Sequence, residues 1–181
     1  LEIRRRHTGK LGQPLYGGTN HTFWRIYLPE SAEIISVKGA EEPTRKDPYR
    51  ALFALQKDAG VETLASLGQK FSDLVTLTPL ADKTEVSFWQ HLSPGEEKTI
   101  QLVYTTPKNL PVEGQEASQH TWYLQKQPGV KWQNFSVALE FDQSLPPPDL
   151  TSSFGDDWQK SEHGWLANTP WKYDAWLSLK F

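Results

Sequence analysis

Apolar and polar residues alternate with a period of two along most of this chain, and this alternation limits the folds open to it. Such a pattern is typical of β-strands that bury one side and expose the other. In residues 23–28, for example, Trp24, Ile26 and Leu28 share one side of a predicted strand. The predicted strands cover residues 1–5, 23–28, 34–37, 74–77, 86–89, 99–104, 122–124, 135–141 and 173–181.

These predicted strands are short and are separated by proline and glycine signals. That organisation is typical of a β-sandwich. The sequence therefore predicts an all-β fold, an immunoglobulin-like β-sandwich of about eight or nine strands. A length of 181 residues suits one domain, so we expect a single domain over residues 1–181, as a piece of a longer protein.

One segment, residues 47–71, breaks the alternation and predicts a helical insertion. Asp47-Pro48 is typical of a helix N-cap followed by proline at the first helical position, and Gly60 is typical of a helix end. We expect this insertion to pack on a sheet edge or over one end of the sandwich, because covering an edge prevents strand-to-strand association. A functional lid is the less favoured alternative.

The pattern also predicts a hairpin and a core. Pro94-Gly95 separates two alternating runs and predicts a turn between antiparallel strands at about 84–92 and 98–106. The apolar sides of the strands predict which side chains are buried together. That predicted core consists of Trp24, Ile26, Phe88, Ile100, Leu102, Val137, Leu139 and Leu177.

Composition and motifs argue against most enzyme classes. The chain has no cysteine, which excludes disulfides, thiolate metal sites and thiol catalysis. Its histidines lack metal-ligand spacing, and it has no serine elbow and no phosphate-binding glycine motif. A net charge of −3 argues against nucleic-acid binding. We therefore expect no catalytic residues and no cofactor, although an acid pair for glycoside hydrolysis leaves no sequence signature and stays a third alternative.

An acidic loop is the best metal candidate in the sequence. It contains Asp142, Asp149, Asp156 and Asp157, with Gly155 allowing a tight turn. Calcium prefers such carboxylate and carbonyl oxygens. The spacing matches no EF-hand, however, so the favoured interpretation is a solvated acidic loop and no metal site is predicted.

Tryptophans supply the candidate ligand platform. Four of the eight lie close together towards the end of the chain, at Trp158, Trp165, Trp171 and Trp176. Exposed indole rings on one sheet face would stack against sugar rings. The alternative, which we favour, is that these rings pack the core of the sandwich, because tryptophan is usually largely buried.

Several strings occur together in a recognisable order. Residues 21–30, 85–96 and 99–104 are followed by 123–129, which ends in Lys126-Gln127-Pro128-Gly129. In this order they resemble the C-terminal β-rich region of the DUF4012 family of large, membrane-anchored bacterial surface proteins. The resemblance covers about residues 20–40 and 84–181. It implies an extracytoplasmic location at the cell surface, and it carries over no catalytic residue.

These observations predict a non-catalytic, extracytoplasmic module of a cell-surface protein, with a structural or partner-binding role. The expected partner is another envelope protein or a cell-surface glycan, not a nucleic acid, and any membrane anchor would lie outside this chain. The alternative is a carbohydrate-binding β-sandwich that uses exposed tryptophans, as part of a glycan-active enzyme.

Overall fold

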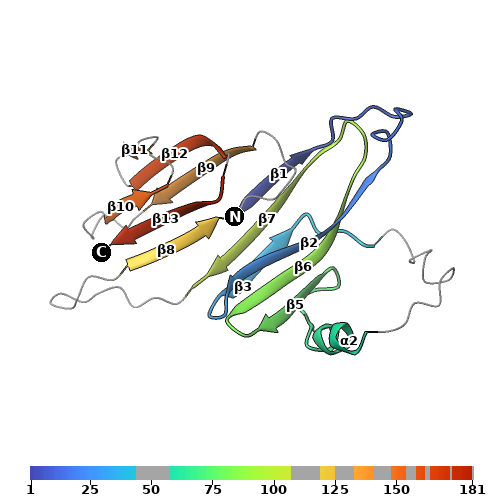
Figure 1. Cartoon of the computed structure of the whole chain (residues 1–181), viewed down its shortest axis with the longest axis horizontal. Coiled ribbons are helices and arrows are strands. Elements are labelled where there is room, and N and C mark those ends of the chain that lie inside the picture. The colour runs from blue at the N-terminus through green and yellow to red at the C-terminus, as the bar shows by residue number, and fades with distance from the viewer. Residues whose placement is uncertain are drawn as a thin grey trace. The chain divides into compact units, whose positions relative to one another are not determined.

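The computed structural model describes residues 1–43, 58–106, 119–124, 133–140, 148–153, 158–161, 164–171 and 173–180. The chain divides into two compact units, unit 1 (Leu1–Pro107) and unit 2 (Lys108–Phe181), both drawn in Figure 1. The described residues are mostly strand with one short helix, which confirms the predicted all-β class at the level of a mostly-β fold. The single domain expected over residues 1–181 stays a prediction.

Unit 1 contains two antiparallel sheets. The three-stranded sheet has the order β1-β7-β3, and the four-stranded sheet has the order β2-β6-β5-β4. The strands of the first are β1 (Glu2–Arg6), β7 (Glu97–Thr105) and β3 (Glu33–Lys38). Those of the second are β2 (Asn20–Pro29), β6 (Lys83–Leu92), β5 (Val75–Leu80) and β4 (Gln69–Lys70).

Unit 2 contains two three-stranded antiparallel sheets, with the orders β10-β13-β8 and β11-β12-β9. The strands of the first are β10 (Asp149–Ser152), β13 (Ala175–Lys180) and β8 (Gln119–Leu124). Those of the second are β11 (Trp158–Ser161), β12 (Gly164–Trp171) and β9 (Gln133–Glu140).

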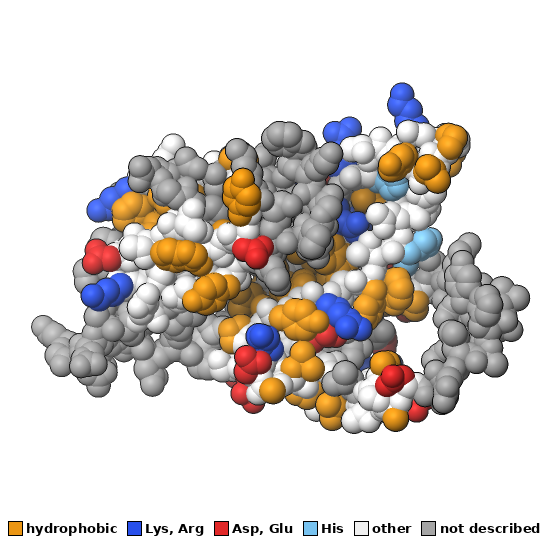
Figure 2. Space-filling view, viewed as in Figure 1, with side chains coloured by type: hydrophobic (Ala, Val, Ile, Leu, Met, Phe, Trp, Pro, Cys, Tyr) orange, Lys and Arg blue, Asp and Glu red, His pale blue; other side chains and the backbone are white. Residues whose placement is uncertain are grey.

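Strand β2 follows the alternation that the sequence predicts. Trp24 and Leu28 are buried on one side, whereas Phe23 and Tyr27 are exposed on the other. Successive side chains of a strand point to opposite sides, so the sequence pattern translates directly into burial. On the surfaces in view, exposed hydrophobic side chains lie among charged ones (Figure 2).

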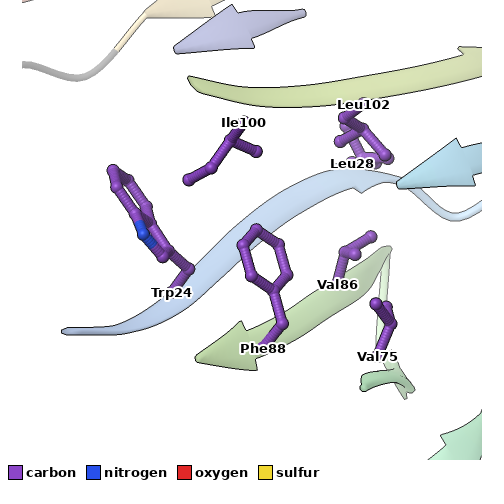
Figure 3. Close-up of a cluster of buried hydrophobic side chains, with 7 residues drawn as sticks. All are labelled: Trp24, Leu28, Val75, Val86, Phe88, Ile100 and Leu102. Atoms are coloured by element: carbon purple, nitrogen blue, oxygen red, sulfur yellow. The ribbon is translucent and has the colours of Figure 1, made fainter. Parts of the chain in front are cut away.

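The core of unit 1 draws on both of its sheets. Ile100 and Leu102 of β7 point toward side chains of β2 and β6 (Figure 3). The buried cluster consists of Trp24, Leu28, Val75, Val86, Phe88, Ile100 and Leu102. Four of the residues predicted to be buried together belong to it, and Ile26 packs against it partly buried.

The other three predicted core residues, Val137, Leu139 and Leu177, lie in unit 2. Leu177 is buried there, and Val137 and Leu139 are half-buried. The predicted cluster is therefore confirmed for its members in unit 1 and stays a prediction for these three residues. A period of two shows which side of a strand is apolar but not which sheet covers it.

The structure corrects the predicted hairpin at Pro94-Gly95. Both strands are where the sequence places them, but β6 pairs with β2 and β5, and β7 pairs with β1 and β3. The Glu96 amide donates to the Ser93 carbonyl oxygen (3.0 Å), and Gly95 adopts a positive φ of 82°. The turn therefore passes the chain from one sheet to the other, so that the apolar sides of β6 and β7 meet in the core instead of lying side by side.

A helix lies within the predicted insertion at α2 (Ala59–Ser66). Its N-cap is Asp58, whose Oδ1 accepts from the amides of Gly60 (2.8 Å) and Val61 (3.1 Å). Gly60 therefore lies in the first turn of α2 and does not end a helix, which corrects that expectation. Asp47-Pro48 falls outside the described residues. Beyond α2, β4 pairs with β5 at one edge of the four-stranded sheet. No helix in the described ranges is long and apolar enough to cross a membrane.

Candidate functional site

The outer side of β2 and β6 carries a group of aromatic side chains. In the register of these strands, His21 lies opposite His91 and Phe23 lies opposite Trp89. Residues that face each other across an antiparallel pair share one side of the sheet. That side is opposite the buried Trp24, so these rings face away from the core of unit 1, although His91 is itself buried, at 9% exposed. We call this surface the aromatic face and define it as His21, Phe23, Arg25, Tyr27, Trp89 and His91.

Four rings of the aromatic face form a continuous row, those of Phe23, Trp89, His91 and His21. The ring centroids of Phe23 and Trp89 lie 5.1 Å apart with the planes tilted by 50°, and Trp89 stacks on His91 at 6.1 Å. His91 meets His21 edge-on at 4.7 Å. The Arg25 guanidinium carbon lies 5.5 Å from the Phe23 ring centroid, in cation–π contact. These contacts fix the rings on a rigid pair of strands.

Phe23 and Tyr27 keep much of their surface in solvent, at 43% and 51% exposed. Arg25 pairs with Glu85 at 3.8 Å, and Glu85 lies opposite Tyr27. The aromatic face therefore combines exposed rings with one balanced ion pair. Large rings and arginine are the side chains that contribute most at protein interfaces.

Hydrogen bonds hold the histidine pair in one tautomeric arrangement. The Nδ1 atoms of His21 and His91 lie 2.8 Å apart, and His91 Nε2 lies 2.8 Å from the Glu42 carbonyl oxygen. A carbonyl accepts only, so His91 Nε2 carries the proton and donates. In its neutral form His91 Nδ1 then accepts from His21 Nδ1–H. The two histidines therefore have a structural role, because they form hydrogen bonds to each other and to the backbone.

A charged network lies next to this pair. Glu41 accepts from the His91 amide and from Lys98 Nζ, each at 2.6 Å. Burial alone would raise the pKa of Glu41, but these two hydrogen bonds outweigh burial and lower it. The hydrogen bond to Glu41 raises the pKa of Lys98, which also contacts Glu96 at 3.3 Å. Both partners stay charged near neutral pH, which suits a structural ion pair and not an acid–base catalyst.

The structure brings together two of the tryptophans predicted as a ligand platform. Trp158 of β11 and Trp165 of β12 share one side of the same sheet, because Trp158 lies opposite Ala167. Both are half-buried, and Trp158 Nε1 donates to Ser152 Oγ (2.7 Å) on β10. Trp176 lies on β13 in the other sheet of unit 2. The side chain of Trp171 falls outside the described residues. The four-residue platform stays a prediction.

Sequence reasoning missed the partner of Trp176. Tyr123 of β8 lies directly opposite Trp176 of β13, and both are exposed, at 83% and 38%. Their neighbour Leu177 is buried, so the two rings face away from the interior of unit 2. Tyr123 follows Trp122 in a short predicted strand, and the sequence pattern predicts no ligand-binding role for it. Only the pairing of β8 with β13, which a sequence pattern does not specify, brings it beside Trp176.

The acidic loop gives no further information on metal binding. Asp149 begins β10 and is exposed, whereas Asp142, Asp156, Asp157 and Gly155 fall outside the described residues. In the part of the chain that the structure describes, no three histidine or acidic side chains come close enough to share a metal ion.

Comparison with known proteins does not indicate a function for these surfaces. No protein-family model matches the chain, and no curated protein and no solved structure matches it significantly.

Proposed function

We propose that this chain is a non-catalytic, extracytoplasmic module of a cell-surface protein, built as an immunoglobulin-like β-sandwich with a partner-binding or structural role. Three observations support this. The fold is mostly β. One buried cluster draws on both sheets of unit 1, as the core of a sandwich does. The sequence also resembles the β-rich region of the DUF4012 surface proteins.

The main support for a partner-binding role comes from the aromatic face. Four of its rings contact one another on the paired strands β2 and β6, so little freedom of these side chains is lost when a partner docks. Phe23 and Trp89 are tilted by 50°, which does not make the flat platform that a sugar ring needs. An irregular surface of rings with an arginine instead suits a protein. The proposed partner is therefore another protein of the cell envelope.

A retention experiment tests this role. The full chain is immobilised and exposed to extracted envelope proteins, alongside the double variant Phe23→Ala/Tyr27→Ala and the control Val103→Ala. Val103 is 48% exposed on β7, in the other sheet of unit 1, so the control truncates an exposed apolar side chain away from the aromatic face. We expect one envelope protein to be retained by the wild type and the control but not by the double variant. Equal retention by all three would argue against the aromatic face.

The non-catalytic part of the proposal has its own test. Glu41 lies beside the aromatic face and is held ionised by its hydrogen bond from Lys98. The histidines form hydrogen bonds to each other and to the backbone, so these groups are already used in structural contacts. We therefore expect no turnover on a broad panel of glycosides and peptides. Measurable hydrolysis that survives repurification would overturn this part.

Carbohydrate binding is the second candidate, and the pair Trp176 and Tyr123 favours it. Two exposed rings side by side on one sheet are an arrangement that stacks against sugars. A polysaccharide array compares the wild type with Trp176→Ala and with the control Tyr173→Ala, a ring that is 79% exposed outside the strands. If the wild type and Tyr173→Ala bind a polysaccharide and Trp176→Ala does not, carbohydrate binding becomes the favoured function. If the wild type binds nothing, the polysaccharides on the array are excluded as ligands.

A further inference from the structure

A cavity of about 410 Å³ opens at the end of unit 1 where β1 runs into the loop that leads to β2. Its wall includes Arg5, Arg6, His7, Tyr16, Thr19 and Asn20. The wall, which consists of described residues only, contains two arginines and no acidic side chain. The upper right of Figure 2, where this loop lies, shows basic, histidine and hydrophobic side chains.

Arg5 occupies an unusual electrostatic position in the three-stranded sheet. It lies directly opposite Lys98 in the register of β1 and β7, so two cations share one side of the sheet. Like charges in that position repel each other. Lys98 is compensated by Glu41 (2.6 Å) and by Glu96 (3.3 Å). Within the described ranges no carboxylate lies within ion-pair distance of Arg5 or of Arg6.

The partners of Arg5 are neutral. Its Nη1 donates to Thr22 Oγ1 (2.9 Å) and, at 3.5 Å, to Gln90 Oε1. Gln90 is fully buried and its Nε2 has no partner among the described residues, so this amide directs its oxygen at the guanidinium. These hydrogen bonds use only Nη1 of a group that has five N–H donors. The guanidinium carbon also lies 5.2 Å from the centroid of the Trp24 ring, in cation–π contact. Among the described residues, the donors other than Nη1 make no hydrogen bond.

Partial burial lowers the pKa of Arg5 because desolvation disfavours the charged form. Arginine nevertheless stays protonated in proteins. The Trp24 ring offsets part of the cost of burying this cation, but no counter-ion among the described residues does, so an anion bound beside Arg5 would be favoured.

The histidine in the wall keeps the cavity formed. His7 Nδ1 accepts from the Gly9 amide (3.0 Å), so Nε2 carries the proton and donates to the Gly18 carbonyl oxygen (3.0 Å). One ring thus joins both ends of the loop over residues 9–18. The loop doubles back tightly, since a Cβ at Gly9 would collide with the Tyr16 carbonyl oxygen. His7 is therefore a positioning residue for the cavity wall.

We propose that this cavity binds a small anionic ligand, whose carboxylate, sulfate or phosphate group is held by Arg5. Arg6 also lines the cavity and adds positive charge to its wall, although as the next residue of β1 it starts from the other side of the strand. The guanidinium fork matches the paired oxygens of such groups. The volume lies within the range of small-molecule sites and suits a ligand of one or two sugar rings. Tyr16, at 65% exposed, offers a ring at the rim. This site lies apart from the aromatic face and does not rest on the proposed function.

Titration of the full chain with glucuronate, inorganic sulfate and inorganic phosphate tests the proposal, with glucose as the neutral counterpart of glucuronate. The key variants are Arg6→Gln and Arg5→Gln. The matched control is Arg4→Gln, which removes the same charge from β1 but at a side chain paired with Glu2 (3.9 Å) and Glu97 (3.7 Å). We expect at least one anion to bind and glucose not to bind. Loss of Arg5 should weaken the affinity about tenfold or more and loss of Arg6 about threefold or more, whereas Arg4→Gln should weaken it less than about twofold.

The three anions distinguish two kinds of natural ligand. Tighter binding of glucuronate than of sulfate or phosphate would indicate an acidic sugar. Equal affinities for all three would indicate a free oxyanion. Two results would overturn the proposal. One is that none of the three anions binds at about 10 mM in low salt, where electrostatic attraction is strongest. The other is that Arg4→Gln weakens binding as much as Arg6→Gln does, which would show a general effect of surface charge. If Arg5→Gln does not fold, Arg6→Gln and its control decide the question.

Discussion

Lys98 Nζ and Glu41 Oε1 lie 2.6 Å apart, and this ion pair joins β7 of one sheet to the segment that bridges to β6 of the other sheet. The two side chains are only 28% and 31% exposed, so solvent screens them less than it screens a surface ion pair. The Glu41 amide also donates to the Trp89 carbonyl oxygen (2.8 Å). The sheets of unit 1 are therefore tied at their margin as well as through the core.

The stability of unit 1 should fall in acid. The pKa of Glu41 is lowered in the folded chain: burial opposes this, but the hydrogen bonds from Lys98 and the His91 amide prevail. A carboxyl whose folded pKa is depressed stabilises the fold above its unfolded pKa of about 4.3, and that contribution is lost as the pH falls through the folded pKa. We therefore expect the free energy of unfolding, measured with urea, to decrease between about pH 5 and about pH 3.

The variant Glu41→Gln isolates this contribution. We expect it to lower the free energy of unfolding by about 1 kcal/mol near neutral pH, and the difference from wild type to shrink in acid. Asp82→Asn is the control, since Asp82 is 79% exposed and pairs with its neighbour Lys83 at 3.8 Å. A difference between wild type and Glu41→Gln that stays constant from neutral pH to acid would contradict this account.

The core assignment predicts opposite outcomes at two adjacent residues of β7. Leu102 is fully buried in the cluster of unit 1, so Leu102→Ala should lower the free energy of unfolding by about 2–5 kcal/mol. Val103 is 48% exposed on the other side of the strand, and Val103→Ala should change it by no more than about 0.5 kcal/mol. Chemical denaturation measures both. A larger loss at Val103 than at Leu102 would show that the two sides of β7 are reversed, and similar losses would contradict the assignment of Leu102 alone to the core.

The turn between the sheets predicts a glycine effect. Gly95 has a φ of 82°, which a residue with a Cβ adopts only with strain, so Gly95→Ala should cost roughly 1–2 kcal/mol. Gly18 has open space around its Cβ position and no positive φ, so Gly18→Ala is the neutral control. If the thermal midpoint of Gly95→Ala equals that of Gly18→Ala, the turn does not require its observed conformation.

Local pattern was enough to predict the strands but not their partners. The alternation around Trp24 predicted which side of β2 is buried, since that depends only on the period of the side chains. The turn at Pro94-Gly95 was placed correctly, but the strands on either side join different sheets. A turn signal specifies where the chain reverses and not which strands then form hydrogen bonds, because pairing depends on the whole core.

The candidate sites show the same limit. Phe23 and Trp89 are far apart in sequence, and only the register of β2 and β6 places their rings in contact. Tyr123 meets Trp176 for the same reason. The cavity beside Arg5 depends on a loop whose shape His7 fixes through two hydrogen bonds, and no motif in the sequence announces that shape.

Photo-crosslinking in intact cells tests the central claim, partner binding through the aromatic face, most directly. A photoreactive phenylalanine analogue replaces Tyr27 in the protein as the cells express it, and the same analogue at Val103 serves as the control. Both positions are about half exposed, at 51% and 48%. We predict a crosslink from position 27 to one defined envelope protein and none of that product from position 103. No crosslink from position 27, or the same product from both positions, would contradict the account.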